Sequence, residues 1–241
     1  MTIVFLKEFR YFFSSTTGYL ILVLYLLSMG MLLWVFPEYS ILESEYATLS
    51  NFFSFVPLVF LGLIPAITMS FFSEEKKSGT IALLSSSPLK DYDIVLGKYF
   101  SSLLFVLIIL VFSLFYYWVL YYLASPIGFI DHVGIIGGFL GLALLGSFFC
   151  SVSLFFSIFG SSQVVCYIIS CIACFFIYQG FFSLKDLFNW SPSSLWMLKI
   201  CAKSHYENIS KGIISTKDLG YFLFSTLFFL ELTIFFFRGK K

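Results

Sequence analysis

Six long apolar segments dominate this sequence, and several of them contain no charged side chain. The hydrocarbon core of a bilayer is about 30 Å thick, so a helix needs about 20 apolar residues to cross it. Only 11% of the 241 residues are charged, whereas soluble domains usually carry about 25%. The sequence therefore predicts an all-α, polytopic membrane protein with six transmembrane helices. These are expected over Gly18–Phe36, Phe52–Phe72, Tyr99–Leu123, Val133–Phe159, Val164–Phe182 and Leu219–Phe237.

The distribution of Lys and Arg predicts the orientation, because short cytoplasmic loops carry an excess of these residues. The loops after the first and third spans contain neither residue. We therefore predict a multi-pass protein with both termini in the cytoplasm. The side assigned to the cytoplasm carries Lys7, Arg10, Lys76, Lys77, Lys90, Lys98, Arg238, Lys240 and Lys241. The remaining five lysines precede the sixth span in a longer loop that this topology places outside, which conflicts with the simple rule.

The first 17 residues combine apolar and charged side chains. Phe5, Phe9 and Phe12 recur at helical spacing, while the charged residues fall largely elsewhere. This pattern is typical of an amphipathic helix lying in the membrane interface. A simple cytoplasmic lead-in to the first span is the alternative. The charged residues assigned to this N-terminal interface helix are Lys7, Glu8 and Arg10.

Small residues and prolines mark two of the spans. The fourth span contains two overlapping G-x-x-x-G pairs, which let helix backbones approach closely in lipid. Packing within the chain and a subunit interface are both possible uses of this surface. Pro57 and Pro65 are expected to kink or locally open the second span, since each lacks a backbone donor. The link from Gly160 to Gln163 is so short that the fourth and fifth spans should form an antiparallel hairpin. The glycines are Gly134, Gly137, Gly138 and Gly141.

The segment between the second and third spans is the most distinctive polar stretch. Glu74–Lys77 form a charged patch next to the membrane, and Ser78-Gly79 interrupts it. A short helix is predicted over Thr80–Leu84, presenting Ile81, Leu83 and Leu84, and Pro88 then separates it from the helix that enters the third span. A short apolar-faced helix between charged flanks is suited to docking in a groove of a soluble partner.

These motifs resemble a known family. The run from Phe72 to Lys98 reads F-x-x-E-x-K-x-G-T-x-x-L-L-x-x-S-P-L-x-x-x-x-I-V-x-G-K and is similar to the signature of ABC-2 type transporter permeases. It resembles in particular the gliding-motility-associated permease subunit of bacterial ABC transporters (GldF type). The segments Lys7–Tyr19, Ser191–Leu195 and His205–Tyr221 extend this likeness over essentially the full chain.

The resemblance implies a single ABC-2 type transmembrane domain over residues 1–241, located in the bacterial inner (cytoplasmic) membrane. It implies an interfacial helix at 1–17, a cytoplasmic coupling segment at 73–98 and an extracellular or re-entrant segment at 183–218. Such a permease pairs with a second permease chain, as a homo- or heterodimer, and with two copies of an ABC ATPase subunit. Its substrate is left open. The residues implied in ATPase coupling are Glu74, Glu75, Lys77, Gly79, Thr80, Ile81, Leu83, Leu84, Pro88 and Lys98.

The sequence lacks the motifs of an enzyme. It contains no G-x-x-x-x-G-K-[ST] and so no phosphate cradle of that kind; ATP and Mg would be bound by the partner ATPase. Net charge is +1, which gives no indication of nucleic-acid binding. A non-transporting membrane assembly or anchoring protein, or an unrecognised membrane enzyme, is the alternative function.

Few side chains within the spans suggest other chemistry. Cys171 and Cys174 form a C-x-x-C in an apolar helix, where packing is expected rather than redox or zinc chemistry. His132 and His205 are more than seventy positions apart, without further assignable ligands, so no metal site is predicted. Glu231 lies within the sixth span, as a possible intramembrane polar site.

Overall fold

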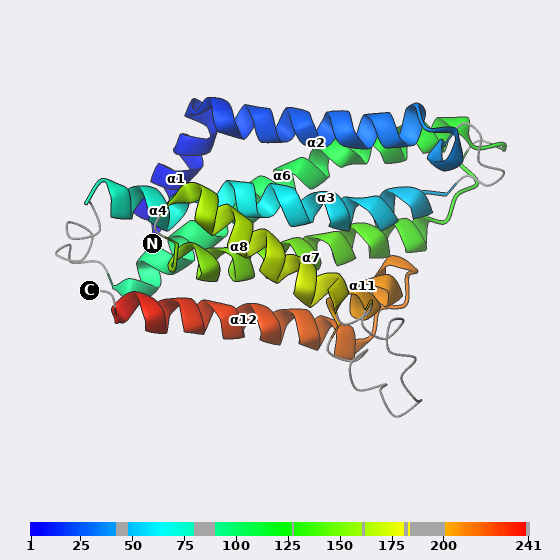
Figure 1. Cartoon of the computed structure of the whole chain (residues 1–241). Helices are drawn as coiled ribbons and strands as arrows, with labels where there is room; N and C mark the ends of the chain where they lie inside the picture. The colour runs from blue at the N-terminus through cyan, green and yellow to red at the C-terminus, as the bar shows by residue number, and fades with distance from the viewer. Residues whose placement is uncertain are drawn as a thin grey trace.

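The computed structural model describes residues 1–41, 48–79, 90–126, 128–160, 162–180, 183 and 201–239. Long helices run side by side in one bundle, and both termini lie at the same end (Figure 1). The described residues contain no strand. The helices are α1 (Thr2–Ser14), α2 (Thr16–Trp34), α3 (Ser50–Thr68), α4 (Ser70–Lys77), α6 (Asp91–Leu123), α7 (His132–Ser157), α8 (Gln163–Phe175), α11 (Ala202–Ser210) and α12 (Thr216–Arg238), with a 3₁₀ turn η1 (Pro37–Tyr39) and a π-helical turn η2 (Phe176–Gly180).

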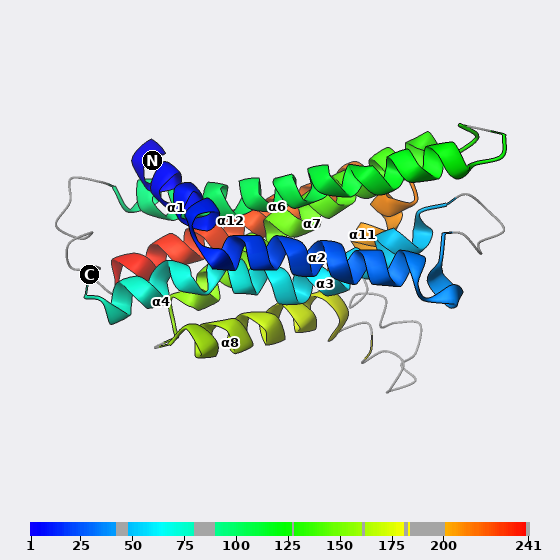
Figure 2. The same ribbon diagram turned by 90° about the horizontal axis from the view of Figure 1, so that it is seen from above.

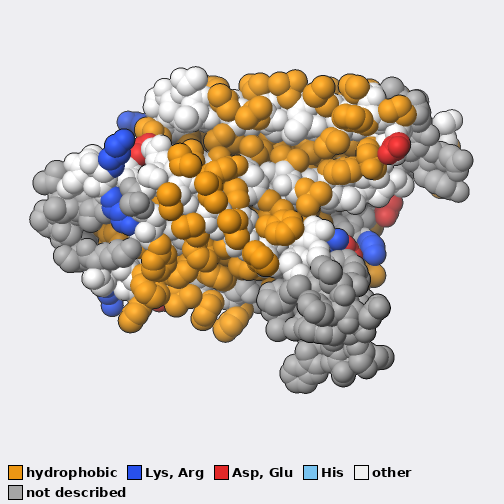
Figure 3. All heavy atoms as spheres, in the orientation of Figure 1, with side chains coloured by type: hydrophobic (Ala, Val, Ile, Leu, Met, Phe, Trp, Pro, Cys, Tyr) orange, Lys and Arg blue, Asp and Glu red, His pale blue; other side chains and the backbone are white. Residues whose placement is uncertain are grey.

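The structure confirms six helical segments long and apolar enough to cross a membrane. Most of their ends agree with the predicted spans within a few residues. The helix predicted to follow Pro88 and enter the third span is confirmed: α6 begins at Asp91, ahead of the span limit placed at Tyr99, and runs for 33 residues. Apolar side chains cover the middle of the molecule and charged ones gather towards its two ends (Figure 3). Helices that expose apolar residues around much of their surface suit a lipid environment.

Helix α7 lies at the centre of the bundle and contacts α3, α6, α8, α11 and α12. Figure 2 shows α6 and α8 on opposite sides of the bundle, with α3 between them. Contact between α7 and α8 across their short connection agrees with the predicted hairpin. The bundle is therefore organised around one buried helix.

The glycines of α7 are used within the chain. A Cβ on Gly137 would lie 2.7 Å from the carbonyl oxygen of Ile209, and one on Gly138 would lie 2.4 Å from the ring of Phe53. Gly141 likewise faces Ile209, at 3.2 Å from its Cγ2. Of the two uses left open by the sequence, these contacts favour packing of α7 against α11 and α3.

Pro57 leaves α3 continuous over Ser50–Thr68. Because Pro57 has no N–H, the carbonyl of Phe53 loses its usual helical donor. The buried hydroxyl of Tyr206 donates to that carbonyl at 2.7 Å. A side chain from α11 thus replaces the missing backbone hydrogen bond. The helical axis is interrupted only after Pro65, at Met69, where α4 begins.

Candidate functional site

A buried ion cluster joins α1, α4 and α6 at the end of the bundle where the termini lie. Lys98 of α6 is 0% exposed, and its ammonium lies 2.8 Å from Glu75 Oε1 and 3.1 Å from Glu8 Oε1. It also donates to the carbonyl of Phe71 at 2.7 Å. The rings of Phe71 and Phe72 lie 5.4 and 5.1 Å from the same nitrogen. A buried ammonium is retained only with such paired charges and acceptors.

Lys7 closes the outer side of this cluster. Its ammonium lies 3.3 Å from Glu75 and 3.5 Å from Glu8, and its side chain is 61% exposed. Burial is the largest influence on the pKa of Lys7 and lowers it, but the charges and hydrogen bonds of Glu8 and Glu75 together outweigh burial, so the pKa is raised. Two lysines and two glutamates therefore form a neutral group that binds α1 to the rest of the bundle.

Helix α4 has two further attachments beside Glu75. Glu74 accepts hydrogen bonds from Tyr11 of α1 at 3.2 Å and from Gln163 of α8 at 2.6 Å. Lys76 donates to the carbonyl of Gly160, in the connection between α7 and α8, at 3.2 Å. Three consecutive charged side chains thus contact different neighbours, so a displacement of α4 would be felt by α1, α6 and α8 together.

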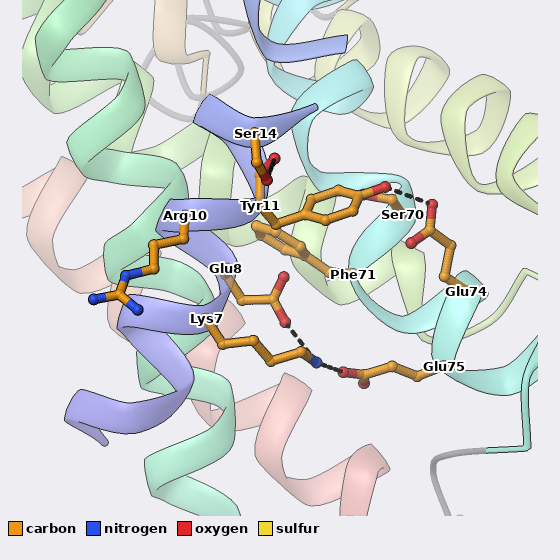
Figure 4. Close-up of a pocket in the computed structure, with 9 residues that line it drawn as sticks. All are labelled: Lys7, Glu8, Arg10, Tyr11, Ser14, Ser70, Phe71, Glu74 and Glu75. Carbon is orange, nitrogen blue, oxygen red and sulfur yellow. Dashed lines mark hydrogen bonds and ion pairs between the residues drawn. The ribbon is translucent and has the colours of Figure 1, made fainter. Parts of the chain in front are cut away.

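A cleft of about 450 Å³ lies between α1 and α4. Figure 4 shows Lys7 reaching across it to Glu75, and Tyr11 to Glu74. The cleft is lined by Lys7, Glu8, Arg10, Tyr11, Ser14, Ser70, Phe71, Glu74 and Glu75. Its two walls are held together by these polar contacts and by the rings of Phe12 and Phe71, which pack edge to face at 5.6 Å between centroids.

Helix α4 ends at Lys77, directly before the Ser78-Gly79 break that the sequence predicted. Gly79 has φ +69°, and its N–H donates to the carbonyl of Lys76 at 3.2 Å. Left-handed backbone after a helix favours glycine. A Cβ at Gly79 would meet nothing within 4 Å, so backbone conformation rather than crowding selects the residue.

The structure separates the predicted coupling residues into three groups. Lys77 and Gly79 are exposed, whereas Glu75 and Lys98 are buried and contact their own chain. Glu74 is partly buried. The other predicted residues, Thr80, Ile81, Leu83, Leu84 and Pro88, lie outside the described residues.

The N-terminal segment is helical, but its polar residues are distributed differently from the prediction. Val4, Glu8 and Phe12 lie four residues apart and form the buried side of α1. Glu8 is therefore on the inner face, 6% exposed, while Arg10 is exposed. Sequence patterning missed this position because Glu8 is buried with a charged partner 90 residues away. The signal available in the sequence was the spacing, because Glu8 lies four residues from both Val4 and Phe12, on the apolar face of α1.

Glu231 lies on the outer surface of α12 rather than in the core. It accepts a hydrogen bond from the Tyr92 hydroxyl, at 3.0 and 3.3 Å to its two oxygens. The Tyr92 ring lies 5.8 Å from the guanidinium carbon of Arg238, which in turn pairs with Asp91 at 3.3 Å. Glu231 is thus linked to polar groups at the first turn of α6.

Both histidines make contacts within the chain. His205 Nδ1 lies 2.6 Å from Asp218 Oδ1, and its ring stacks on Tyr221 at 4.2 Å between centroids. His132 Nδ1 lies 3.1 Å from the Tyr117 hydroxyl. The described residues hold no group of three or more His, Cys, Asp or Glu side chains that could bind a metal ion.

Comparison with known proteins places this bundle in a family. A family model described as ABC-2 family transporter protein matches residues 41–235, which include five of the six spans. No curated protein matches the chain. The match covers more than half of the sequence and agrees with the six-span helical bundle. The chain therefore belongs to the ABC-2 transporter family and is a membrane-spanning component of the permease type.

Proposed function

We propose that this chain is the permease subunit of an ABC transporter, and that a separate ATPase subunit supplies the energy. Family membership supports the permease role, and the missing phosphate-binding motif agrees with hydrolysis on another chain. Likeness of the His205–Tyr221 segment to gliding-motility-associated permeases supports placing the protein in that group. Its substrate class is not part of this proposal.

The proposed assembly contains a second permease chain and two ATPase chains. The end that carries the termini would face the cytoplasm, because Lys7, Arg10, Lys76, Lys77 and Arg238 gather there. The short loops after α2 and α6 lack such residues, whereas the longer segment before the sixth span carries five lysines. The ATPases would then approach α1, α4 and the segment after Gly79.

The observation that carries the proposal is the buried Lys98 cluster. The segment from Gly79 to Lys90 connects α4 with α6, and Glu75 and Lys98 join the same two helices through a direct ion pair of 2.8 Å. A partner that moved this segment would act on two elements already fixed to each other and to α1. Since α4 continues α3 after a single break, and α6 spans the whole bundle, the displacement would reach the membrane-spanning helices.

Reconstitution with an ABC ATPase that co-purifies with this chain tests the proposal. The permease alone should hydrolyse no ATP, and the complex should hydrolyse ATP faster than the ATPase alone. Leu83→Asp should abolish this stimulation while leaving the purified permease folded by circular dichroism. Lys217→Gln, a substitution of an exposed residue at the opposite end, serves as the control. Full stimulation with Leu83→Asp would refute the docking assignment.

Labelling of single cysteines tests the orientation separately. Lys77→Cys should react with a membrane-impermeant maleimide only after the cells are permeabilised, whereas Lys217→Cys should react in intact cells. Reaction of Lys77→Cys from outside would overturn the proposed topology, and with it the ATPase contact.

A further inference from the structure

A second cavity lies at the end of the bundle opposite the termini. It has a volume of about 440 Å³ and is enclosed by the start of α3, by η2 and by one face of α11. Cavities of this size hold small ligands in many proteins, and π-helical turns are frequent at functional sites. Its lining residues are Ser50, Phe53, Ser54, Leu58, Tyr178, Gln179, Lys203, Tyr206, Glu207, Ser210 and Lys211.

Helix α11 contributes the charged wall of this cavity. Lys203, Glu207 and Ser210 follow one another at spacings of four and three residues and so share one helical face, and Lys211 directly follows Ser210 as the C-cap of α11. Lys203 and Glu207 lie 3.9 Å apart and offset each other's charge. The ammonium of Lys211 forms no ion pair with any residue in the described ranges. The positive charge of Lys211 is therefore available to bind an anionic group.

Helix α3 contributes a wall that changes from polar to apolar with depth. Ser50, Ser54, Leu58, Gly62 and Ala66 lie four residues apart, the first three in the outer cavity and the last two in a second groove. Residues four apart advance about 40° beyond a full turn, so the stripe winds gradually around α3. No charged residue lies between Leu58, in the outer cavity, and Gly62, in the groove.

The second groove is apolar and lies between α2, α3 and α8. Its volume is about 410 Å³, and it is lined by Thr17, Leu20, Ile21, Leu24, Ser28, Val59, Gly62, Leu63, Ala66, Met69 and Tyr167. Its α3 lining runs from Val59 to Met69, which is about 15 Å at 1.5 Å per residue. One leaflet of the hydrocarbon core is about 15 Å thick. The groove therefore has the length and polarity of a site for one acyl chain.

We propose that these two features form one binding site for an anionic amphiphile. The phosphate or carboxylate headgroup lies in the outer cavity near Lys211, with the hydroxyl of Ser50 as a further donor. The apolar chain follows the stripe past Leu58 and Gly62. The proposal goes beyond the permease assignment, and it needs no ATPase.

The direct test is lipid binding to the full chain purified in dodecyl maltoside. Native mass spectrometry with phosphatidylglycerol should show saturable binding that is stronger than that of phosphatidylcholine, whose headgroup has no net charge. Glycerol 1-phosphate, which lacks the chain, should bind more weakly than the lipid. Equal binding of the two lipids, or equal binding of lipid and glycerol 1-phosphate, would overturn the proposal.

Two variants separate the headgroup from the chain. Lys211→Gln should weaken phosphatidylglycerol binding about tenfold, the effect of losing one charged hydrogen bond, whereas Lys217→Gln should leave it unchanged. Gly62→Leu should fill the groove and weaken binding by a similar factor, because a Cβ there meets only the Tyr167 hydroxyl at 3.7 Å. Gly220→Leu, at a position open within 4 Å, is its control. Unchanged binding in both Lys211→Gln and Gly62→Leu would refute the site.

A measurement on the unaltered chain guards against variants that fail to fold. Phosphatidylglycerol with a diazirine in its acyl chain should cross-link to peptides containing residues 58–66 of α3 and Tyr167 of α8. Cross-links confined to α6 and α12 would contradict the proposed groove. Because all these assays use the chain without an ATPase, their failure is distinct from failure of the coupling experiment.

Discussion

Substitution of Lys98 by Met removes the centre of the buried ion cluster. In the native chain the Lys98 ammonium lies within 3.1 Å of one oxygen each of Glu8 and Glu75, and within 2.7 Å of the Phe71 carbonyl. The variant leaves two buried carboxylates facing each other with only Lys7, whose side chain is 61% exposed, beside them. Removing one partner of a buried ion pair costs about 3–5 kcal/mol, so we expect a loss of that size in the free energy of unfolding.

The assay is titration of the purified chain in mixed micelles with sodium dodecyl sulfate, followed by loss of tertiary contacts. Lys7→Met is the matched control and should cost about 1 kcal/mol or less, because it removes an exposed charge. The triple variant Lys98→Met, Glu8→Gln, Glu75→Gln should regain most of the loss, since no unpaired charge remains buried. A Lys98→Met cost no larger than that of Lys7→Met, or a triple variant as unstable as Lys98→Met, would refute this account of the cluster.

Three further outcomes can be measured. Tyr206→Phe should lower the free energy of unfolding by about 1–3 kcal/mol in the same titration, because the Phe53 carbonyl is left without a hydrogen-bond donor. An unchanged midpoint would show that water or another group donates to this carbonyl. Gly137→Ala should lower the free energy of unfolding by about 1–3 kcal/mol, because its Cβ would crowd the backbone of α11. Gly220→Ala should raise the free energy of unfolding by about 0.5–1 kcal/mol through helix propensity. Equal changes in the two variants would contradict close packing of α7. Lys7 should be acylated more slowly at pH 9 in the native chain than in a variant with Glu8 and Glu75 both changed to Gln, because the raised pKa of Lys7 keeps its ammonium protonated. The ion pairs of Lys7 should persist until the pH rises through that raised pKa. Equal acylation rates in the two proteins would contradict the raised pKa.

Much of the fold could be predicted because a membrane span is a local property. Each span must supply its own apolar length and its own backbone hydrogen bonds, so composition within about 20 residues determines it. The observed starts of α2, α3, α7, α8 and α12 lie within three residues of the predicted ones. The helix that enters the third span was also predicted, because Pro88 and Asp91 mark its start locally. The span itself was placed from Tyr99 because Asp91, Asp93 and Lys98 precede it, and hydropathy alone cannot show that Lys98 is buried.

The sequence by itself therefore determined the class of the protein, the number and limits of most spans and the break at Gly79, because each follows from properties of adjacent residues. Only the tertiary structure decided that Glu8, Glu75 and Lys98 form ion pairs in the interior. It also decided that the Tyr206 hydroxyl donates to the carbonyl that Pro57 leaves without a donor, and that α11 and α3 pack against the glycines of α7. The physical reason is distance along the chain. These contacts join residues 23 to 153 positions apart, and their free energy depends on how helices pack rather than on any local pattern.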